Sequence, residues 1–214
     1  MLGVQGVGGS SPPSPIFFVF MHKNHIRRDI NQILNRLDRK TRAARSRAIA
    51  ARLFSLPEWR DCRSLLAFAG RNDEVDTRQI MAEALAGGRL VYAPRVEGMD
   101  LIFHRIAVLD DISVPHPYGM LEPPVLLPRF SGEDRPPGRC LILVPGLAFD
   151  RHKNRLGRGK GFYDRFLRAQ GERAGGESFF SLGICFQVQL LDAVPHSEED
   201  MAVDAVLTDT ELVR

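Results

Sequence analysis

The sequence predicts a single α/β domain of three layers, with a largely parallel central sheet between helices. Three observations carry this prediction. Two helical stretches open the regular part of the chain, and short apolar runs of strand length follow them. Between the first two runs lies a segment with helical spacing, and strand, helix, strand at this distance is typical of a parallel crossover. With 214 residues, 44% of them hydrophobic, the chain can fill the core of one such domain.

Four helices are predicted from the spacing of apolar residues. Near the N-terminus the apolar positions recur at helical spacing, at Ile26, Ile30, Ile33, Leu34 and Leu37. A second stretch, residues 41–54, is rich in alanine and arginine. In residues 76–88, Thr77 is placed to cap a helix and two glycines are placed to end it. A last helix follows the glycine-rich segment described below, with Phe166 and Leu167 on its inward face.

Six short apolar runs predict the strands. They span residues 64–69, 89–94, 99–106, 139–145, 180–186 and 204–209. Residues 111–138 are rich in proline and glycine and show no periodicity, so we expect a long loop there. Loops of this length are often functional.

The first 20 residues do not share this pattern, because they carry no charged side chain and are rich in glycine, serine and proline. We expect residues 1–20 to be a disordered or non-native extension, Met21 to be the functional start, and one domain to cover residues 21–214. The apolar run 16–20 is too short to span a membrane, and no basic segment precedes it as a secretory signal requires. We therefore expect a cytoplasmic protein without a membrane partner.

The cysteines exclude two classes of small domain. Cys62, Cys140 and Cys185 are odd in number and widely spaced, which argues against a disulfide framework, and no C-x-x-C pair offers a zinc site. We expect buried thiols in a reducing compartment. The six histidines form no metal-binding pattern either, so general-base chemistry by histidine is not indicated.

The segment RLGRGKGFYD, Arg155 to Asp164, contains the clearest functional signal. A glycine-rich turn at a helix N-terminus presents backbone N–H groups to an anion, and glycine leaves room for phosphate oxygens. Arg158 and Lys160, which alternate with the glycines, add positive charge. The spacing is neither that of a Walker A loop nor that of the dinucleotide fingerprint. We interpret the segment as a phosphate-binding loop after the strand-like run CLILVP, with a purely structural glycine turn as the alternative.

A series of motifs places this loop in a longer context. The motifs are LVPGLAFDRHKNRLGRGKGFYDRFL at 143–167, NDEVDT at 72–77, YAPRV at 92–96, PYGMLEP at 117–123 and EEDMAVDAVLTD at 198–209. In content and order they resemble those of the 5-formyltetrahydrofolate cyclo-ligase family, also called 5,10-methenyltetrahydrofolate synthetases. The resemblance covers nearly all of the chain after Met21, and it also supplies the expected order of the sheet.

The resemblance implies an enzyme of one-carbon metabolism, a ligase that depends on ATP and Mg²⁺. It would convert 5-formyltetrahydrofolate to 5,10-methenyltetrahydrofolate and release ADP and phosphate. In this chemistry the γ-phosphoryl group is transferred to the formyl oxygen, which then leaves as N-10 closes the ring. Such a transfer asks the protein mainly for positioning and charge neutralisation. We expect small-molecule substrates, no nucleic-acid partner and a monomer.

The resemblance also assigns residues to the nucleotide. Lys160 and Arg158 would act on the transferred phosphoryl group and are the expected catalytic residues. The residues expected to bind ATP are Lys23, Arg27, Arg155, Leu156, Gly157, Arg158, Gly159, Lys160, Gly161, Phe162 and Tyr163. Lys23 and Arg27 lie one helical turn apart. A solvated helix face is the alternative for both, because many neighbouring arginines have no assigned role.

Folate and metal residues follow from the same resemblance. The residues expected to bind folate are Ala69, Glu74, Tyr118 and Phe162. Glu74 would accept paired hydrogen bonds from the pterin, and Tyr118 would stack on it. Asp164 and Asp204 would hold Mg²⁺, which prefers oxygen ligands. The alternatives are that Asp164 complements the helix dipole and that Asp204 caps a strand end.

Two positions depart from the family pattern. Lys153 stands where the family usually has glycine, so the turn DRHKNRLG is expected to be strained or differently shaped. Phe162 replaces a common tyrosine, which preserves stacking but removes a hydroxyl hydrogen bond.

Two other functions stay open at this point. A nucleic-acid-binding module is suggested by the arginine-rich helices and a pI near 9.0. Against it, the arginines are spread around their helices and no docking motif is found. The second alternative is a catalytically inactive relative that binds folate, although every charged position of the motifs is occupied.

Overall fold

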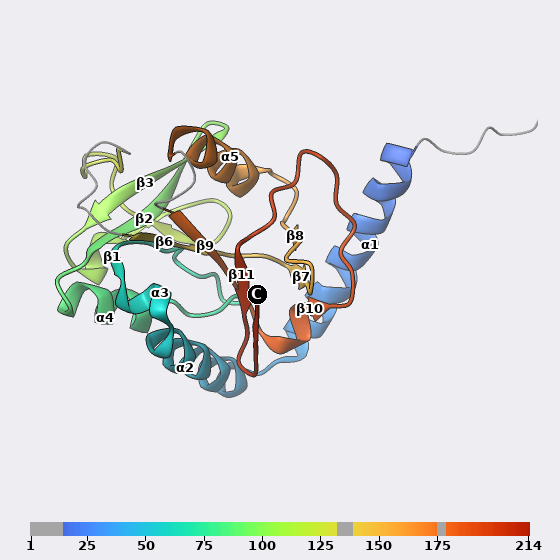
Figure 1. Ribbon diagram of the computed structural model, residues 1–214, viewed down its shortest axis with the longest axis horizontal. Coiled ribbons are helices and arrows are strands. Elements are labelled where there is room, and N and C mark those ends of the chain that lie inside the picture. The colour runs from blue at the N-terminus through green and yellow to red at the C-terminus, as the bar shows by residue number, and fades with distance from the viewer. Residues whose placement is uncertain (1–14, 132–138, 175–178) are drawn as a thin grey trace, which may run out of the picture.

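The computed structural model describes residues 15–131, 139–174 and 179–214 and contains a central sheet of seven strands (Figure 1). The strands run in the order β12-β11-β9-β6-β1-β2-β3. Their bounds are β1 Cys62–Leu66, β2 Leu90–Glu97, β3 Asp100–Ile106, β6 Arg139–Val144, β9 Phe179–Ile184, β11 Ala205–Leu207 and β12 Leu212–Val213. The five central strands are parallel, while β3 and β12 pair antiparallel at the edges.

Helices cover both faces of this sheet, which confirms the three layers. Their bounds are α1 Pro15–Arg36, α2 Arg39–Ser55, α3 Pro57–Arg60, α4 Arg78–Ala86 and α5 Phe162–Ala174, with 3₁₀ turns at η1 Leu109–Asp111 and η2 Gln187–Gln189. Helices α2, α3 and α4 lie on one side and α5 on the other (Figure 1). Successive residues of β1 point to opposite cores, since Leu65 packs with the α2 and α4 side and Leu66 with the α5 side.

Three small elements complete the fold. A three-stranded sheet β10-β7-β8 lies between the main sheet and α1, and a hairpin β4-β5 lies within the predicted long loop (Figure 1). Their bounds are β4 Val114–Pro115, β5 Leu121–Glu122, β7 Ala148–Asp150, β8 Arg155–Leu156 and β10 Leu190–Leu191. Part of that loop, residues 132–138, lies outside the described residues.

The predicted crossover is confirmed, because β1, α4 and β2 follow one another and β1 pairs with β2 in parallel. The expected packing of α5 is also confirmed: Leu167 is buried and the Phe166 ring lies 4.7 Å from the Phe103 ring, centroid to centroid. The helix predicted near the N-terminus is confirmed as α1, in which Ile30 and Leu34 are buried while Ile33 is 38% exposed, so only part of the apolar face packs against the core.

Three other expectations hold only in part. Thr77 occupies the N-cap position of α4 as predicted, but its hydroxyl donates to the Phe68 carbonyl and makes no capping hydrogen bond. The glycine-rich segment follows β8 rather than β6, because a turn and two short strands lie between them. Helix α1 begins at Pro15, ahead of the boundary expected at Met21. Residues 1–14 lie outside the described residues, so the expected extension stays a prediction there.

All three cysteines are free and buried, as expected. Burial raises the pKa of the Cys62 thiol to about 11, which keeps it protonated and unreactive at neutral pH. Among the helices in the described ranges, none combines the length and the apolar composition needed to cross a bilayer.

Candidate functional site

A cavity of about 240 Å³ opens at the carboxyl edge of the parallel strands. Phe68 and Ala69, which follow β1, and Pro145 and Gly146, which follow β6, form part of its wall. Adjacent parallel strands end at the same edge of a sheet, and this edge is where open α/β sheets bind ligands. Apolar side chains from β2, β3 and the β4-β5 hairpin line another part of it: Pro94, Val96, Leu101, Met120 and Leu121.

The glycine loop, residues 157–161, connects β8 to α5 and closes one side of the cavity. Gly159 and Gly161 have φ angles of 94° and 66°, in the left-handed region that favours glycine. Arg27 of α1 supports the loop from outside, because its Nε donates to the Gly157 carbonyl over 2.9 Å. Burial of Arg27 lowers its pKa and the nearby Asp200 raises it, with burial the larger influence.

Three buried polar groups on the cavity wall lack a hydrogen-bond partner within the described part of the chain. They are Nε of Arg71, Nε of Arg155 and the hydroxyl of Tyr163. The Arg155 guanidinium lies 5.8 Å from the centre of the Tyr163 ring. Burial, and to a lesser extent the charge of Glu74, raises the pKa of the Tyr163 hydroxyl, so this group is a neutral donor. Unsatisfied buried polar groups are costly, and a ligand that fills the cavity would supply the missing partners.

Arg155 is anchored by the first turn of α5. Its Nη2 donates to Oδ1 of Asp164 over 2.7 Å, and its Nη1 donates to the Pro145 carbonyl over 3.3 Å. The Met201 backbone N–H also donates to Oδ1 of Asp164. Oδ2 of Asp164 receives no hydrogen bond from the described residues, and Asp164 lines the cavity. One carboxylate oxygen is thus free for a further contact.

The two cations of the glycine loop contact the opposite wall. Arg158 donates from Nε to Oε1 of Glu74 over 3.2 Å and from Nη2 to Oδ2 of Asp73 over 2.8 Å. Partial burial lowers the pKa of Arg158, but the two carboxylates outweigh burial and raise it overall. Lys160 Nζ lies 5.8 Å from the centre of the Tyr118 ring, within range of a cation–π contact.

The C-terminal part of the chain contacts Asp164 at Met201, directly after Asp200, rather than at Asp204. Lys23 forms an ion pair with Asp200, and the next residue, Met201, donates its N–H to Asp164. Burial raises the pKa of Asp200, but hydrogen bonds from Lys23 and Ser197 together lower it by more than burial raises it. The carboxyl is therefore ionised at neutral pH.

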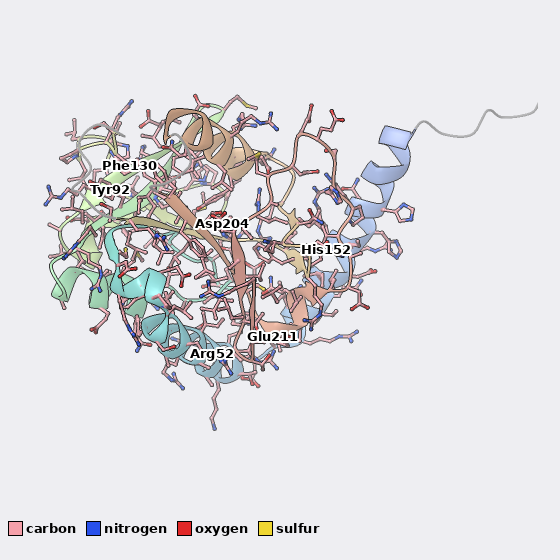
Figure 2. The ribbon with its side chains drawn as sticks, viewed as in Figure 1. Arg52, Tyr92, Phe130, His152, Asp204 and Glu211 are labelled. Atoms are coloured by element: carbon pink, nitrogen blue, oxygen red, sulfur yellow. The ribbon has the colours of Figure 1, made fainter. Side chains whose placement is uncertain are left out.

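Asp204 lies outside the cavity lining. Its Oδ2 accepts 2.7 Å hydrogen bonds from both the backbone N–H and the hydroxyl of Ser181, across the junction of β9 and β11. Figure 2 shows Asp204 in the middle of the molecule, beside these strands. This is the strand-end role that the sequence left open as an alternative. In the described ranges, no three or more His, Cys, Asp or Glu side chains converge on a metal-binding position.

The structure brings most of the predicted residues to one cavity. The lining includes Ala69, Glu74, Tyr118, Arg155, Gly157, Arg158, Lys160, Gly161, Phe162, Tyr163 and Asp164. The lining does not include Lys23, Arg27, Leu156, Gly159 and Asp204. Of these, Arg27 contacts the loop, and Lys23 reaches Asp200 beside it.

Sequence reasoning missed two acids at the site besides Asp200. Asp73 binds Arg158, and buried Glu122 lines the cavity while accepting a 2.9 Å hydrogen bond from the Val96 N–H. Both occur in motifs quoted above, NDEVDT and PYGMLEP. Their place within a motif could have indicated these acids from the sequence, but a motif does not show which of its acids faces the cavity.

Comparisons with known proteins agree on one family. The family model described as "5-formyltetrahydrofolate cyclo-ligase family" matches residues 19–209. A probable 5-formyltetrahydrofolate cyclo-ligase of Schizosaccharomyces pombe is 28% identical over 207 residues, covering 91% of this chain and 98% of the relative. A mitochondrial 5-formyltetrahydrofolate cyclo-ligase of Arabidopsis thaliana is 29% identical over 215 residues, covering 91% of this chain and 76% of the relative.

A solved structure shares the fold as well. The NMR structure of Aquifex aeolicus 5,10-methenyltetrahydrofolate synthetase superimposes with a TM-score of 0.74 at 28% sequence identity, covering 90% of this chain and 92% of that one. Since the family match spans residues 19–209 and the structural match covers 90% of the chain, this chain belongs to the 5-formyltetrahydrofolate cyclo-ligase family.

Proposed function

We propose that this protein is an ATP-dependent 5-formyltetrahydrofolate cyclo-ligase, which produces 5,10-methenyltetrahydrofolate, ADP and phosphate. One observation supports it above the others: a basic glycine loop and the carboxylate of Glu74 face each other across a single apolar cavity. The loop suits a polyphosphate, and the carboxylate with its apolar surroundings suits a flat heterocycle that carries N–H groups.

The nucleotide binds along the glycine loop. The loop N–H groups and the N-terminus of α5 face the phosphates, and Arg158 and Lys160 contact the transferred group. Arg27 contacts the loop at Gly157 and Lys23 pairs with Asp200, so we expect both to meet the phosphates by exchanging these partners.

The folate occupies the apolar part of the cavity. Glu74 accepts hydrogen bonds from the pterin, while Tyr118 and Phe162 stack on the flat rings beside Ala69. This arrangement places the formyl group between the pterin site and the glycine loop. The formyl oxygen attacks the γ-phosphorus and ADP leaves; N-10 then attacks the formyl carbon, and the C–O bond breaks to release phosphate. The protein's contribution is alignment and neutralisation of charge.

The donor set near the loop fits Mg²⁺. This ion is usually held by one or two carboxylates together with substrate phosphates, and its charge lowers the repulsion between phosphate oxygens. Asp164 offers its free Oδ2, and we assign Asp200 as the second acid because the next residue, Met201, donates its N–H to Asp164. Asp204 accepts hydrogen bonds from Ser181 across the sheet, and no contact within the described residues joins it to Asp164, so we assign it to the sheet and not to the metal.

Absorbance provides the direct test. The methenyl product absorbs in the near ultraviolet and the substrate does not, so purified protein with ATP, Mg²⁺ and 5-formyltetrahydrofolate should show a rising signal. Lys160→Ala should abolish it, while Arg47→Ala, a charge removal on the exposed side of α2, should not. Protein that binds no nucleotide and leaves the folate unchanged would refute the proposal.

The same preparation tests the remaining alternatives. Salt-sensitive binding to arbitrary DNA without turnover would favour the nucleic-acid module. Two arginines of α2 are already engaged within the fold, however, because Arg45 and Arg52 contact Asp209. We also propose a cytoplasmic monomer, which fractionation and light scattering can check.

A further inference from the structure

The two expected ligand subsites are joined by direct contacts between their own side chains. Arg158, expected to bind phosphate, is held by Glu74, expected to bind the pterin, and by the adjacent Asp73. The second cation of the loop also contacts a residue expected to bind folate, because Lys160 lies over the ring of Tyr118. The contacts of Arg158 and of Lys160 therefore both join the glycine loop to the opposite wall of the cavity.

The ion pairs of Arg158 with Glu74 and Asp73 are strong enough to affect ligand affinity and weak enough for a ligand to break. The Arg158 side chain is 31% exposed, Asp73 22% and Glu74 14%, so the pairs are neither fully solvated nor deeply buried. Glu74 is further fixed by the Arg71 backbone N–H, which donates to its Oε2 over 3.0 Å. A partly exposed ion pair of this kind is worth up to about a factor of five in an equilibrium, or about 1 kcal/mol.

We propose that Arg158, Glu74 and Asp73 form a latch across the cavity, whose opening couples the folate and nucleotide subsites so that each ligand binds more tightly after the other. This inference rests on the proposed function. The pterin needs the Glu74 carboxylate, and the phosphates need the Arg158 guanidinium, so either ligand must break the Glu74–Arg158 contact. The first ligand bears that cost, and the second finds its partner already released.

Asp73 has a separate effect because neither ligand is expected to contact it. Once the pterin has taken Glu74, Asp73 still holds Arg158, so it opposes nucleotide binding with or without folate. Asp73 is thus a positioning residue that sets the nucleotide affinity, while the Glu74–Arg158 contact sets the coupling.

The decisive variant is Arg158→Gln, because the latch predicts an increase in folate affinity and simple electrostatics predicts a decrease. Removing a cation from a cavity that binds an anionic folate should weaken folate binding by long-range attraction alone. The latch predicts the reverse: Glu74 is released, and 5-formyltetrahydrofolate alone binds roughly two- to five-fold more tightly. A gain in affinity also cannot arise from misfolding. Arg78→Gln is the matched control, since it removes a cation that pairs with Asp76 and not with Glu74.

Isothermal titration calorimetry on the full chain measures these affinities, with Mg²⁺ and a non-hydrolysable ATP analogue as the nucleotide. In the wild type, folate should tighten nucleotide binding about five-fold, and nucleotide should tighten folate binding by the same factor. Asp73→Asn should tighten nucleotide binding two- to five-fold, whereas Asp76→Asn, whose carboxylate contacts Arg78, should not.

Turnover of the wild type distinguishes a failure of the latch from a failure of the proposed function. If the wild type produces the methenyl product but Arg158→Gln binds folate no better than the wild type, the latch is refuted and the proposed function stands. If the wild type binds neither ligand, both are refuted. Tighter folate binding by Arg158→Gln with an unchanged folate affinity of Arg78→Gln supports the latch.

Discussion

Replacing Asp150 by asparagine should destabilise the protein substantially, because this buried carboxylate organises the turn that leads into the glycine loop. Each of its oxygens accepts two hydrogen bonds. Oδ1 accepts from the backbone N–H groups of His152 and Asn154, and Oδ2 accepts from the Asn154 side chain and the Val194 N–H, all within 2.9–3.0 Å. His152 marks this turn in Figure 2.

The magnitude follows from these four bonds. Asparagine keeps one oxygen, which can serve the two N–H groups now bound to Oδ1, while its NH₂ group faces the other two donors. The Asn154 amide can rotate to present its oxygen, but the Val194 N–H is part of the backbone and is buried. One buried donor is therefore left unsatisfied, and the retained bonds lose their charge. Together these effects cost about 2–3 kcal/mol, or about 5–10 °C in melting temperature for a chain of this size.

Thermal and urea unfolding of Asp150→Asn would measure this loss, with Asp192→Asn as a control because Asp192 is exposed and precedes Val194 by two residues. Weaker nucleotide binding should accompany the loss of stability, since the turn supports Arg155. An unfolding midpoint equal to that of the wild type would refute the reasoning, as it would show that the four hydrogen bonds are not needed.

The other predictions concern single side chains. Lys153→Gly should stabilise the protein by about 0.5 kcal/mol in urea unfolding, because relief of a positive φ of 69° exceeds the added entropy of the unfolded chain; equal or lower stability would contradict this. Glu74→Gln should weaken folate binding at least about tenfold and nucleotide binding much less, as calorimetry can show. Tyr163→Phe should leave the stability of the free protein unchanged or slightly higher while weakening ligand binding about five-fold, since its hydroxyl has no partner within the described chain; lower stability would argue against a ligand contact. Hydrogen bonds from Arg214 hold the pKa of Glu58 below its ordinary 4.5, so this pair stabilises the fold above that pH and less as pH falls through the lowered value; Glu58→Gln should reduce the acid sensitivity of unfolding, and an unchanged pH profile would contradict the assignment.

The main layers of the fold could be predicted because long elements carry a readable period. Residues 41–54 and 76–88 were expected as helices, and α2 and α4 occupy those positions. Strands of two or three residues that lie outside one of the six apolar runs carry no such period, so β7, β8 and the edge strand β12 were missed. Their places depend on contacts between segments distant in sequence, such as the parallel pairing of β7 with β10.

The site was predictable to a similar extent and for a related reason. The glycine loop was predicted from its own residues and Glu74 from the family resemblance, and the structure places both at one cavity, while their ligands stay predictions. The choice between Asp200 and Asp204 could not be made from spacing, since it depends on the path of the chain between them: Asp200 pairs with Lys23, and Asp204 turns toward Ser181. At Lys153 the resemblance did indicate a special backbone, and this is the only non-glycine residue with a positive φ in the described ranges.

The contacts of the basic residues bear on how the site selects its ligand. Each cation expected to meet the nucleotide already has a partner in the protein: Lys23 has Asp200, Arg27 has the Gly157 carbonyl, Arg155 has Asp164, Arg158 has two carboxylates, and Lys160 has the Tyr118 ring. Phosphate binding is therefore an exchange of partners, and its free energy is the small difference between the contacts made and those given up. An anion with one or two charges gains too little from this exchange to displace several partners at once. A triphosphate, with three linked phosphates, can replace several contacts in one binding event. Selectivity for a polyphosphate thus follows from the pairing of the cations as much as from their number.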